Sequence, residues 1–165
     1  MNTQDICCIE FNVEKWDNKT FVWDKKPFIK ETIPTLFHIP FPPMIGNKIT
    51  KMMKYAEDAK MLDPNKEDTL ILFQDPTPFK TIIYLGVTGV VPNANNTSLS
   101  GTYEAKVYDG SFNDVPKFVN DMNSKLVKNG KSKPKDSDYF IHFAYCPKCA
   151  EKYKHNYMIL FAKVS

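Results

Sequence analysis

The sequence predicts an α+β fold in which two β-α-β-β units form one antiparallel sheet with both helices on one face. The same order of apolar extended runs and one helix-period segment occurs twice, at residues 32–88 and 99–164. Each helical segment carries a single apolar stripe, so both helices are expected to cover the same side of the sheet. The other side would then carry a cleft between the units, and such clefts are common ligand sites.

The first unit begins with an extended apolar run at residues 33–39, which Pro40, Pro42 and Pro43 end. Residues 46–62 have helical periodicity, with Ile45, Ile49, Met52, Met53, Ala56 and Ala59 on one stripe. Strands are expected at residues 70–73 and 81–87, joined by a proline-rich turn. Residues 1–31 belong to neither unit and are interpreted as an N-terminal arm within one domain of residues 1–165.

The second unit follows a polar linker at residues 89–98 and starts with a strand at residues 102–108. The clearest element is a helix over residues 115–127, because Asn113 or Asp114 can cap it and Gly130 is a natural stop. Its apolar stripe consists of Val115, Phe118, Val119, Met122 and Leu126. Two further strands are expected at residues 139–145 and 157–164, which completes the repeat.

The composition excludes several classes of protein. All 22 basic residues are Lys, and the absence of Arg argues against sequence-specific nucleic-acid binding, for which Arg is the preferred side chain. No apolar run is long enough for a transmembrane helix, and the N-terminus lacks the features of a signal peptide. We therefore expect a cytoplasmic protein with a small-molecule partner and neither nucleic acid nor membrane. The sequence does not indicate the oligomeric state.

Residues 99–112, followed by a helix, resemble the strand and Gly-small-aromatic turn of the GyrI-like small-molecule-binding domains. The Asp75-Pro76 turn with residues 82–87 is similar to the first half of that family, and residues 145–157 are similar to its stand-alone branch labelled hydrolase. The resemblance covers residues 32–164. It implies SHS2-type paired units whose cleft binds bulky, often cationic aromatics in multidrug-responsive regulators, or hydrolyses cyclopropane-containing compounds. This sequence lacks the regulators' helix-turn-helix.

Strand alternation nominates the residues that would face this cleft. They are Tyr84, Glu104, Lys106, Tyr108, Tyr139, His142, Tyr145, Tyr157 and Phe161. Glu104 is the sharpest candidate, because a carboxylate among tyrosines could attract a cation or act as a general base. The alternative is that Glu104 pairs with a lysine or lies in water, as carboxylates on exposed sheet faces commonly do.

Cys146-Pro147-Lys148-Cys149 is a C-x-x-C motif, which supplies half of a tetrahedral zinc site. His155 is a candidate third ligand, and the adjacent Cys7 and Cys8 could contribute only if the N-terminal arm folds back. The alternatives are a redox pair, for which the elements of a thioredoxin fold are lacking, and a plain loop at the edge of the cleft.

Three functions follow from these observations. The first is binding of a small aromatic or amphipathic, and in some relatives cationic, molecule in the cleft. The second is hydrolysis of an electrophilic xenobiotic in the same cleft, with Glu104 as the base and tyrosines as walls. The third is an interaction module stabilised by zinc. The first two require no cofactor.

Overall fold

The computed structural model describes residues 8–40 and 42–165, without the side chain of Pro42. The elements in chain order are α1 (Val13–Trp16), β1 (Lys19–Leu36), β2 (Ile39–Pro40), α2 (Pro42–Asp58), η2 (Lys66–Asp68), β3 (Ile71–Thr77), β4 (Lys80–Gly86), β5 (Asn96–Asp109), η3 (Phe112–Asp114), α3 (Val115–Lys128), η4 (Asp136–Asp138), β6 (Tyr139–Phe143), α4 (Pro147–Tyr153) and β7 (Tyr157–Lys163).

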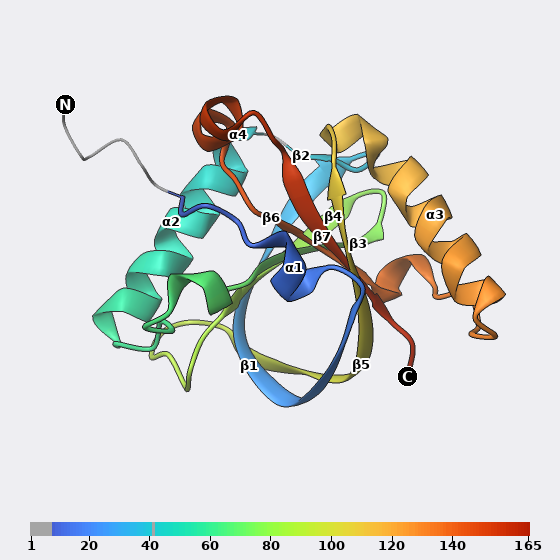
Figure 1. Ribbon diagram of the computed structural model, residues 1–165. Helices are drawn as coiled ribbons and strands as arrows, with labels where there is room; N and C mark the ends of the chain where they lie inside the picture. Colours follow the sequence, from blue (N-terminus) through green and yellow to red (C-terminus); the bar gives the residue numbers. More distant parts are fainter. Residues whose placement is uncertain (1–7, 41) are drawn as a thin grey trace.

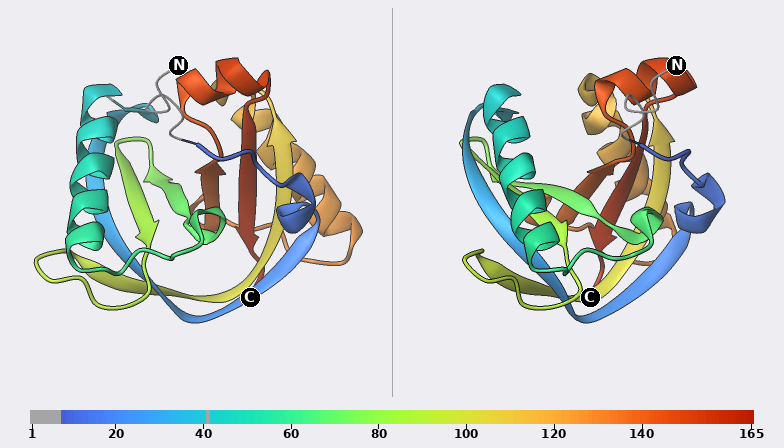
Figure 2. Two further views of the ribbon diagram at one scale, coloured as in Figure 1. Left: turned by 60° about the vertical axis from the view of Figure 1, so that its left-hand side comes forward. Right: turned by 90° about the vertical axis from the view of Figure 1, so that its left-hand side faces the viewer.

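The strands form a closed antiparallel barrel (Figures 1 and 2). The order is β2-β1-β4-β3-β6-β7-β5, and β5 pairs in turn with β1, so that every strand except β2 belongs to the ring. Closure depends on β1, which is 18 residues long. Its first part pairs with β5 and its second part with β4, and the register with β5 shifts between Trp23 and Lys26. Closing the ring leaves few unpaired backbone groups.

The prediction of one open sheet with both helices on one face is therefore wrong. Residues 19–31, which we expected in an N-terminal arm, lie in β1 and hydrogen-bond to β4 and β5. These bonds join the two ends of the sheet. As a result, the sheet face away from the helices is the inside of a barrel rather than an open cleft.

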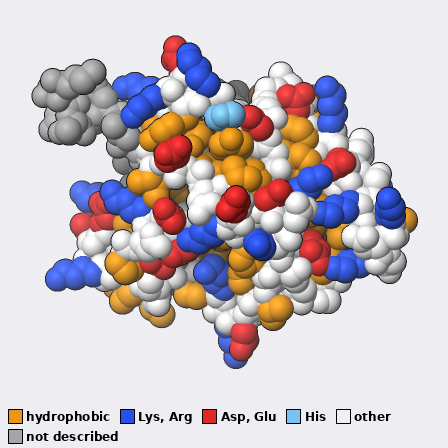
Figure 3. Space-filling view, viewed as in Figure 1, with side chains coloured by type: hydrophobic (Ala, Val, Ile, Leu, Met, Phe, Trp, Pro, Cys, Tyr) orange, Lys and Arg blue, Asp and Glu red, His pale blue; other side chains and the backbone are white. Residues whose placement is uncertain are grey.

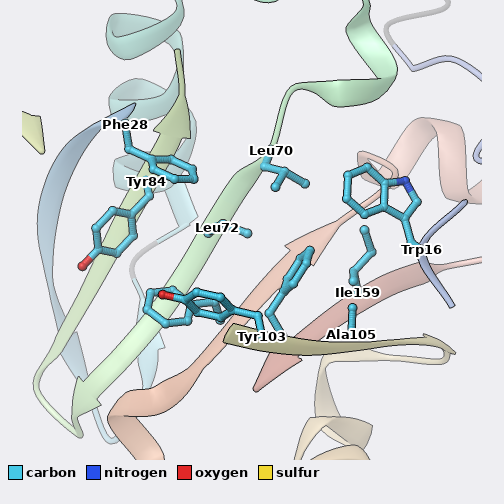
Figure 4. Packing of buried hydrophobic residues seen from close by; sticks show 10 residues of the cluster. Trp16, Phe28, Leu70, Leu72, Tyr84, Tyr103, Ala105 and Ile159 are labelled. Carbon is cyan, nitrogen blue, oxygen red and sulfur yellow. The ribbon is translucent and has the colours of Figure 1, made fainter. Parts of the chain in front are cut away.

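Aromatic side chains fill the barrel. The largest buried cluster contains Trp16, Phe28, Leu70, Leu72, Tyr84, Tyr103, Ala105, Phe140, Ile159 and Phe161, and Figure 4 shows how they converge from several strands. Trp23 packs against this cluster with its ring 4.3 Å from that of Tyr103. Such pairs stabilise a core beyond the burial of their area. The core thus lies inside the barrel, and most of the interior is occupied.

Two helices cover the outside of the barrel on opposite sides (Figure 1). Residues of α2 such as Met52 and Ala56 pack on Ile83 and Leu85 of β4, while α3 packs Met122 and Leu126 on Leu160 of β7. In β4, the alternate residues Ile82 and Tyr84 face the interior cluster. This is the alternation expected of a strand with one face under a helix and the other in a core.

Local sequence explains where the helices begin and end. A capping box formed by Ser111 and Asp114 precedes α3, and Gly130 follows it with a φ of 76°, a conformation that glycine adopts without strain. The predicted helix over residues 115–127 agrees with this element, and α2 begins a few residues earlier than predicted. Within residues 8–40 and 42–165, no helix combines the length and apolar character needed to cross a bilayer.

Candidate functional site

A pocket opens at one end of the barrel, where β6 begins and β7 ends. Its volume is about 370 Å³, which falls within the range of sites for small organic ligands. Residues from five strands and from the turn before β6 line it. They are Gln74, Tyr84, Ser98, Leu99, Ser100, Tyr103, Ser137, Asp138, Phe140 and Lys163.

Aromatic rings and a short hydrogen-bond chain form the inner wall of the pocket. The Tyr84 hydroxyl donates to Gln74 Oε1 at 2.9 Å, and Gln74 Nε2 donates to the carbonyl of Ser137 at 2.5 Å. The Tyr103 hydroxyl lies 3.4 Å from the carbonyl of Ser100. Figure 4 shows the hydroxyl groups of both tyrosines on the side of the core away from Trp16. The wall therefore combines apolar ring faces with polar tips.

Both wall tyrosines are protonated at neutral pH. Burial raises the pKa of Tyr84 above its usual value of 10. Burial, with smaller contributions from Tyr84 and the Asp138 carboxylate, raises the pKa of Tyr103 to about 12. A neutral phenol has a single O–H donor, and that of Tyr84 is already engaged by Gln74. The Tyr103 hydroxyl, whose bond to Ser100 is long at 3.4 Å, is therefore the wall donor that can turn to an incoming polar group.

One acid and one base stand at the pocket. Asp138 Oδ2 accepts a hydrogen bond from the backbone N–H of Lys135 at 3.1 Å, which fixes the carboxylate at the end of η4. Lys163 forms none of the ion pairs found in the described part of the chain. Its side chain passes so close to Gly101 that a Cβ there would lie 2.7 Å from Lys163 Cε. Gly101 has a φ of 135°, which also favours glycine.

Of the residues that the sequence nominated for the cleft, Tyr84 lines this pocket, and Phe161 lies in the core behind it. Four others lie outside the barrel beside α3 or the loop that follows it. Glu104 pairs with Lys131 and accepts from Thr20 Oγ1 at 3.1 Å. Lys106 and Tyr108 both donate to Asp121 of α3, at 2.8 and 2.7 Å.

Tyr139 is the fourth residue of this outer group, and its hydroxyl bonds to Asn123 of α3. Burial and the nearby carboxylates raise the pKa of Tyr139 to about 12. Successive side chains of β5 point to opposite faces of the strand. Tyr103 and Ala105 point into the barrel. The residues that alternate with them, Glu104, Lys106 and Tyr108, therefore point out. The structure therefore separates Glu104 from Tyr84 by the thickness of the barrel wall.

The remaining nominated residues lie toward the opposite end of the barrel. His142 of β6 pairs with Leu72, and its Nδ1 lies 3.1 Å from both N and O of Ile71. Burial lowers the pKa of His142 to about 4, although the hydrogen bond with Ile71 acts in the other direction. Tyr145 and Tyr157 lie beyond the end of β6 and at the start of β7, with their ring centroids 6.1 Å apart.

Three cysteines meet at this second end. The sulfur atoms of Cys8, Cys146 and Cys149 all lie within 4.8 Å of one another, close enough to hold a metal ion. Cys8 belongs to the N-terminal segment, so that part of the arm does fold back onto the C-x-x-C motif. His155 instead stacks on Tyr157 and bonds to Asp109 Oδ2 at 2.8 Å. Cys7 lies outside the described residues.

The surface above this end mixes apolar and charged side chains, and Lys148, Glu151 and Lys152 of α4 are exposed. Figure 3 shows apolar side chains gathered near the upper centre of the view, where α4 and the segment before α1 lie in Figure 1. On the same face, lysines and acidic side chains are interspersed rather than segregated. Charges arranged in this way create no single-sign field over this face.

Of the ten residues that line the pocket, the nominated set contained Tyr84 alone, and it lacked Gln74, Tyr103 and Asp138 among the polar ones. Tyr103 and Lys163 were assigned to strands, but only the closed barrel shows that they meet. Asp138 directly precedes a strand, and a carboxylate at the mouth of a barrel is a recognisable signal once the closure is known. Cys8 was considered as a ligand, but its proximity to Cys146 requires a contact across 138 positions of sequence.

Comparison with known families gives one match. The family model described as bacterial hydrolase matches residues 1–164, which is nearly the whole chain. No curated protein matches the sequence.

Proposed function

Since the chain belongs to the family described as bacterial hydrolase, and a pocket opens at the mouth of its barrel, we propose that it binds a small aromatic or amphipathic molecule there. The observation that carries the proposal is the pocket of about 370 Å³ with Tyr84, Tyr103 and Phe140 in its wall. Barrel mouths with aromatic walls and a few convergent polar groups are frequent ligand sites.

The polar groups specify the ligand further. The Lys163 ammonium and the Tyr103 hydroxyl are donors, so they favour a planar molecule that carries an acceptor such as a sulfonate, a carboxylate or a carbonyl. Asp138 stands at the same pocket and would disfavour a second negative charge. A cationic ligand, as the resemblance to multidrug-binding relatives implies, would need to approach Asp138 and avoid Lys163.

Two related dyes test this proposal. Anilinonaphthalene sulfonate is an anionic aromatic, and phenylnaphthylamine is its neutral counterpart. The affinity of each is measured by dye fluorescence, together with the quenching of Trp23, whose ring lies 4.3 Å from that of Tyr103. We expect both dyes to bind, with the sulfonate tighter by about ten- to a hundredfold, because one hydrogen bond to a charged group contributes about 1.5–3 kcal/mol.

Two variants and a control assign the site. Lys163→Met should remove the preference for the sulfonate and leave the neutral dye unchanged, and Tyr84→Phe should weaken both dyes severalfold. Glu104→Gln, on the outside of the barrel, is the matched control and should leave both affinities unchanged. Equal affinities in all four proteins would show that the dyes bind elsewhere, and the proposal would fail.

Hydrolysis is the second candidate, and the family name supports it. The acid of the pocket that could act as a general base is Asp138, in place of Glu104. In this proposal, the Asp138 carboxylate takes a proton from water as the water oxygen attacks the carbonyl carbon of an ester, whose π electrons move to the carbonyl oxygen. Collapse of this intermediate breaks the bond to the alcohol or phenol, which leaves with the proton held by Asp138. The Tyr103 hydroxyl would stabilise the negative charge that develops on the substrate.

A nitrophenyl ester provides a direct assay for this chemistry. Asp138→Asn should reduce turnover at least about a hundredfold, the scale of general-base catalysis, while the affinity for the neutral phenylnaphthylamine stays within about twofold. Turnover that is equal in wild type and Asp138→Asn would remove hydrolysis at this pocket and leave the binding proposal intact.

We also propose that the chain is related to the GyrI-like small-molecule-binding domains. Two successive strand-helix-strand-strand units, β1-α2-β3-β4 and β5-α3-β6-β7, support it. A zinc-stabilised interaction module is compatible with both candidate functions, because the cysteines and the pocket lie at opposite ends of β6 and β7.

A further inference from the structure

We infer that Cys8, Cys146 and Cys149 bind a structural zinc ion that fastens the N-terminal segment across the end of the barrel opposite the pocket. The inference is independent of the proposed function, because none of the three residues lines the pocket. It rests on the geometry of the cluster, on its chemistry and on the contacts around it.

The geometry suits tetrahedral coordination. Zinc–sulfur bonds of about 2.3 Å place the sulfurs of a tetrahedral site about 3.8 Å apart. The three sulfurs already lie within 4.8 Å of one another, so a small contraction around an ion is sufficient. A set of thiolates selects zinc, copper(I) or iron–sulfur clusters over magnesium and calcium, which prefer oxygen ligands.

Local structure places the two ligands of the C-x-x-C motif. Cys146 immediately precedes α4, and the N–H of Ala150 donates to the carbonyl of Cys146 at 2.9 Å, which closes the first turn. Residues three apart on a helical turn lie on one face, so Cys146 and Cys149 can reach the same ion. Cys149 is 2% exposed, and water has little access to its sulfur.

The third ligand comes from a distant part of the chain. The N–H of Cys146 donates to the Cys8 sulfur at 3.4 Å, a contact that supports a negatively charged thiolate. Two further hydrogen bonds hold the same segment: the Tyr153 hydroxyl donates to the carbonyl of Cys8 at 3.3 Å, and the N–H of Phe11 donates to the Tyr145 hydroxyl at 2.8 Å. The segment is thus positioned for coordination without any change of fold.

A fourth ligand completes a structural zinc site. Cys7 precedes Cys8 directly and lies outside the described residues. His155 faces Asp109 rather than the three sulfurs. The variant Cys7→Ser distinguishes two forms of the site. Loss of affinity for zinc identifies Cys7 as the fourth ligand, and unchanged affinity leaves the fourth position to water.

Metal analysis of the untagged protein is the first experiment. We expect one zinc ion per chain in the wild type and its loss in Cys146→Ser/Cys149→Ser. Replacement of zinc by cobalt should give the intense visible bands of a tetrahedral site and a thiolate-to-cobalt charge-transfer band. A wild type that is isolated without metal and binds neither zinc nor cobalt at equimolar concentration would overturn the inference, as would zinc retained by the double variant.

A measurement on the wild type guards against a variant that fails to fold. A strong chelator should lower the midpoint of thermal unfolding, and added zinc should restore it, while the affinity for phenylnaphthylamine stays unchanged. Alkylation under non-reducing conditions distinguishes the alternative of a disulfide. Cysteines that resist alkylation until a reductant is added, in metal-free protein as isolated, would contradict a zinc site.

Discussion

His142 is a histidine whose surroundings favour the neutral imidazole. It lies on β6, paired with Leu72, and burial lowers its pKa from 6.5 to about 4. In the unfolded chain the same group titrates near its ordinary value of about 6.5. At any pH between these two pKa values, the unfolded state therefore binds a proton that the folded state does not bind. Stability must fall as the pH falls through this window.

Chemical denaturation at about pH 7 and pH 4 measures this effect. For His142→Gln, which cannot titrate, we expect a smaller loss of stability at the lower pH than in the wild type. The difference between the two proteins should reach about 3 kcal/mol, because each pKa unit corresponds to about 1.4 kcal/mol. Below the folded-state pKa the difference should stay constant. Parallel pH profiles for the two proteins would contradict the depressed pKa.

Single residues could be placed correctly only where the sequence showed what each face of their strand packs against. For β4 the apolar pattern of Ile83 and Leu85 identified the helix side, so Tyr84 could be assigned to the other face. For β5 the pattern of Tyr103 and Ala105 identified a core, but the core was the inside of the barrel. Glu104 was consequently placed in a cleft, whereas it pairs with Lys131 outside.

β1 is the element on which the fold depends. Its inward residues Phe21 and Trp23 pack on the interior cluster, whereas Val22 between them is 76% exposed. The Trp23 ring contacts the rings of Tyr103, Phe28 and Phe161 at centroid distances of 4.3, 6.0 and 5.4 Å. The first half of β1 is thus a structural strand of the barrel rather than an arm laid over it.

Two alanine variants of β1 test this assignment. Trp23→Ala should lower the free energy of unfolding by about 3 kcal/mol, because it removes a large side chain from a packed core. Val22→Ala, its neighbour on the outer face, should cost less than about 1 kcal/mol. Urea denaturation followed by circular dichroism gives both values. Similar small losses in both variants would mean that residues 19–23 are not part of the core.

The two main helices were predictable, but the closure of the sheet was not. Residues such as Met122 and Leu126 repeat at helical spacing, and this periodicity is a local signal. The pairing of β1 with β5 joins Thr20 to Glu104, which are 84 positions apart. No local pattern encodes such a contact. The proline-ended run at residues 33–39 was visible, but its continuity with residues 19–31 was not.

The two ends of the barrel carry different functional groups. The pocket lies where β6 begins and β7 ends, and the cysteines lie beyond the other ends of the same strands. The aromatic core separates them, with rings such as Phe161 and Tyr103 packed between. Cys8 and Phe11 of the N-terminal segment contribute to the cysteine end, and none of its described residues lines the pocket.

Removal of residues 1–12 tests this separation. The truncated protein loses Cys8 and Phe11 but keeps Trp16 and every strand. We expect it to fold with an unchanged circular dichroism spectrum and to bind phenylnaphthylamine within about twofold of the wild type, since none of the described residues that it loses lines the pocket. Its thermal stability should no longer respond to a chelator. A folded truncation that has lost dye binding would show that the two ends are coupled.

The position of Ser165 matters for how this chain is produced and immobilised. The carbonyl of Ser165 accepts a hydrogen bond from the N–H of Thr102 at 3.0 Å, and a Cβ on Gly101 would lie 2.6 Å from that carbonyl oxygen. An affinity tag fused after Ser165 would therefore lie beside Lys163 and obstruct the entrance of the pocket. A polyhistidine tag before Met1 would bring imidazoles close in sequence to Cys7 and Cys8, where they would compete for any metal. A cleavable fusion partner, removed before measurement, avoids both artefacts.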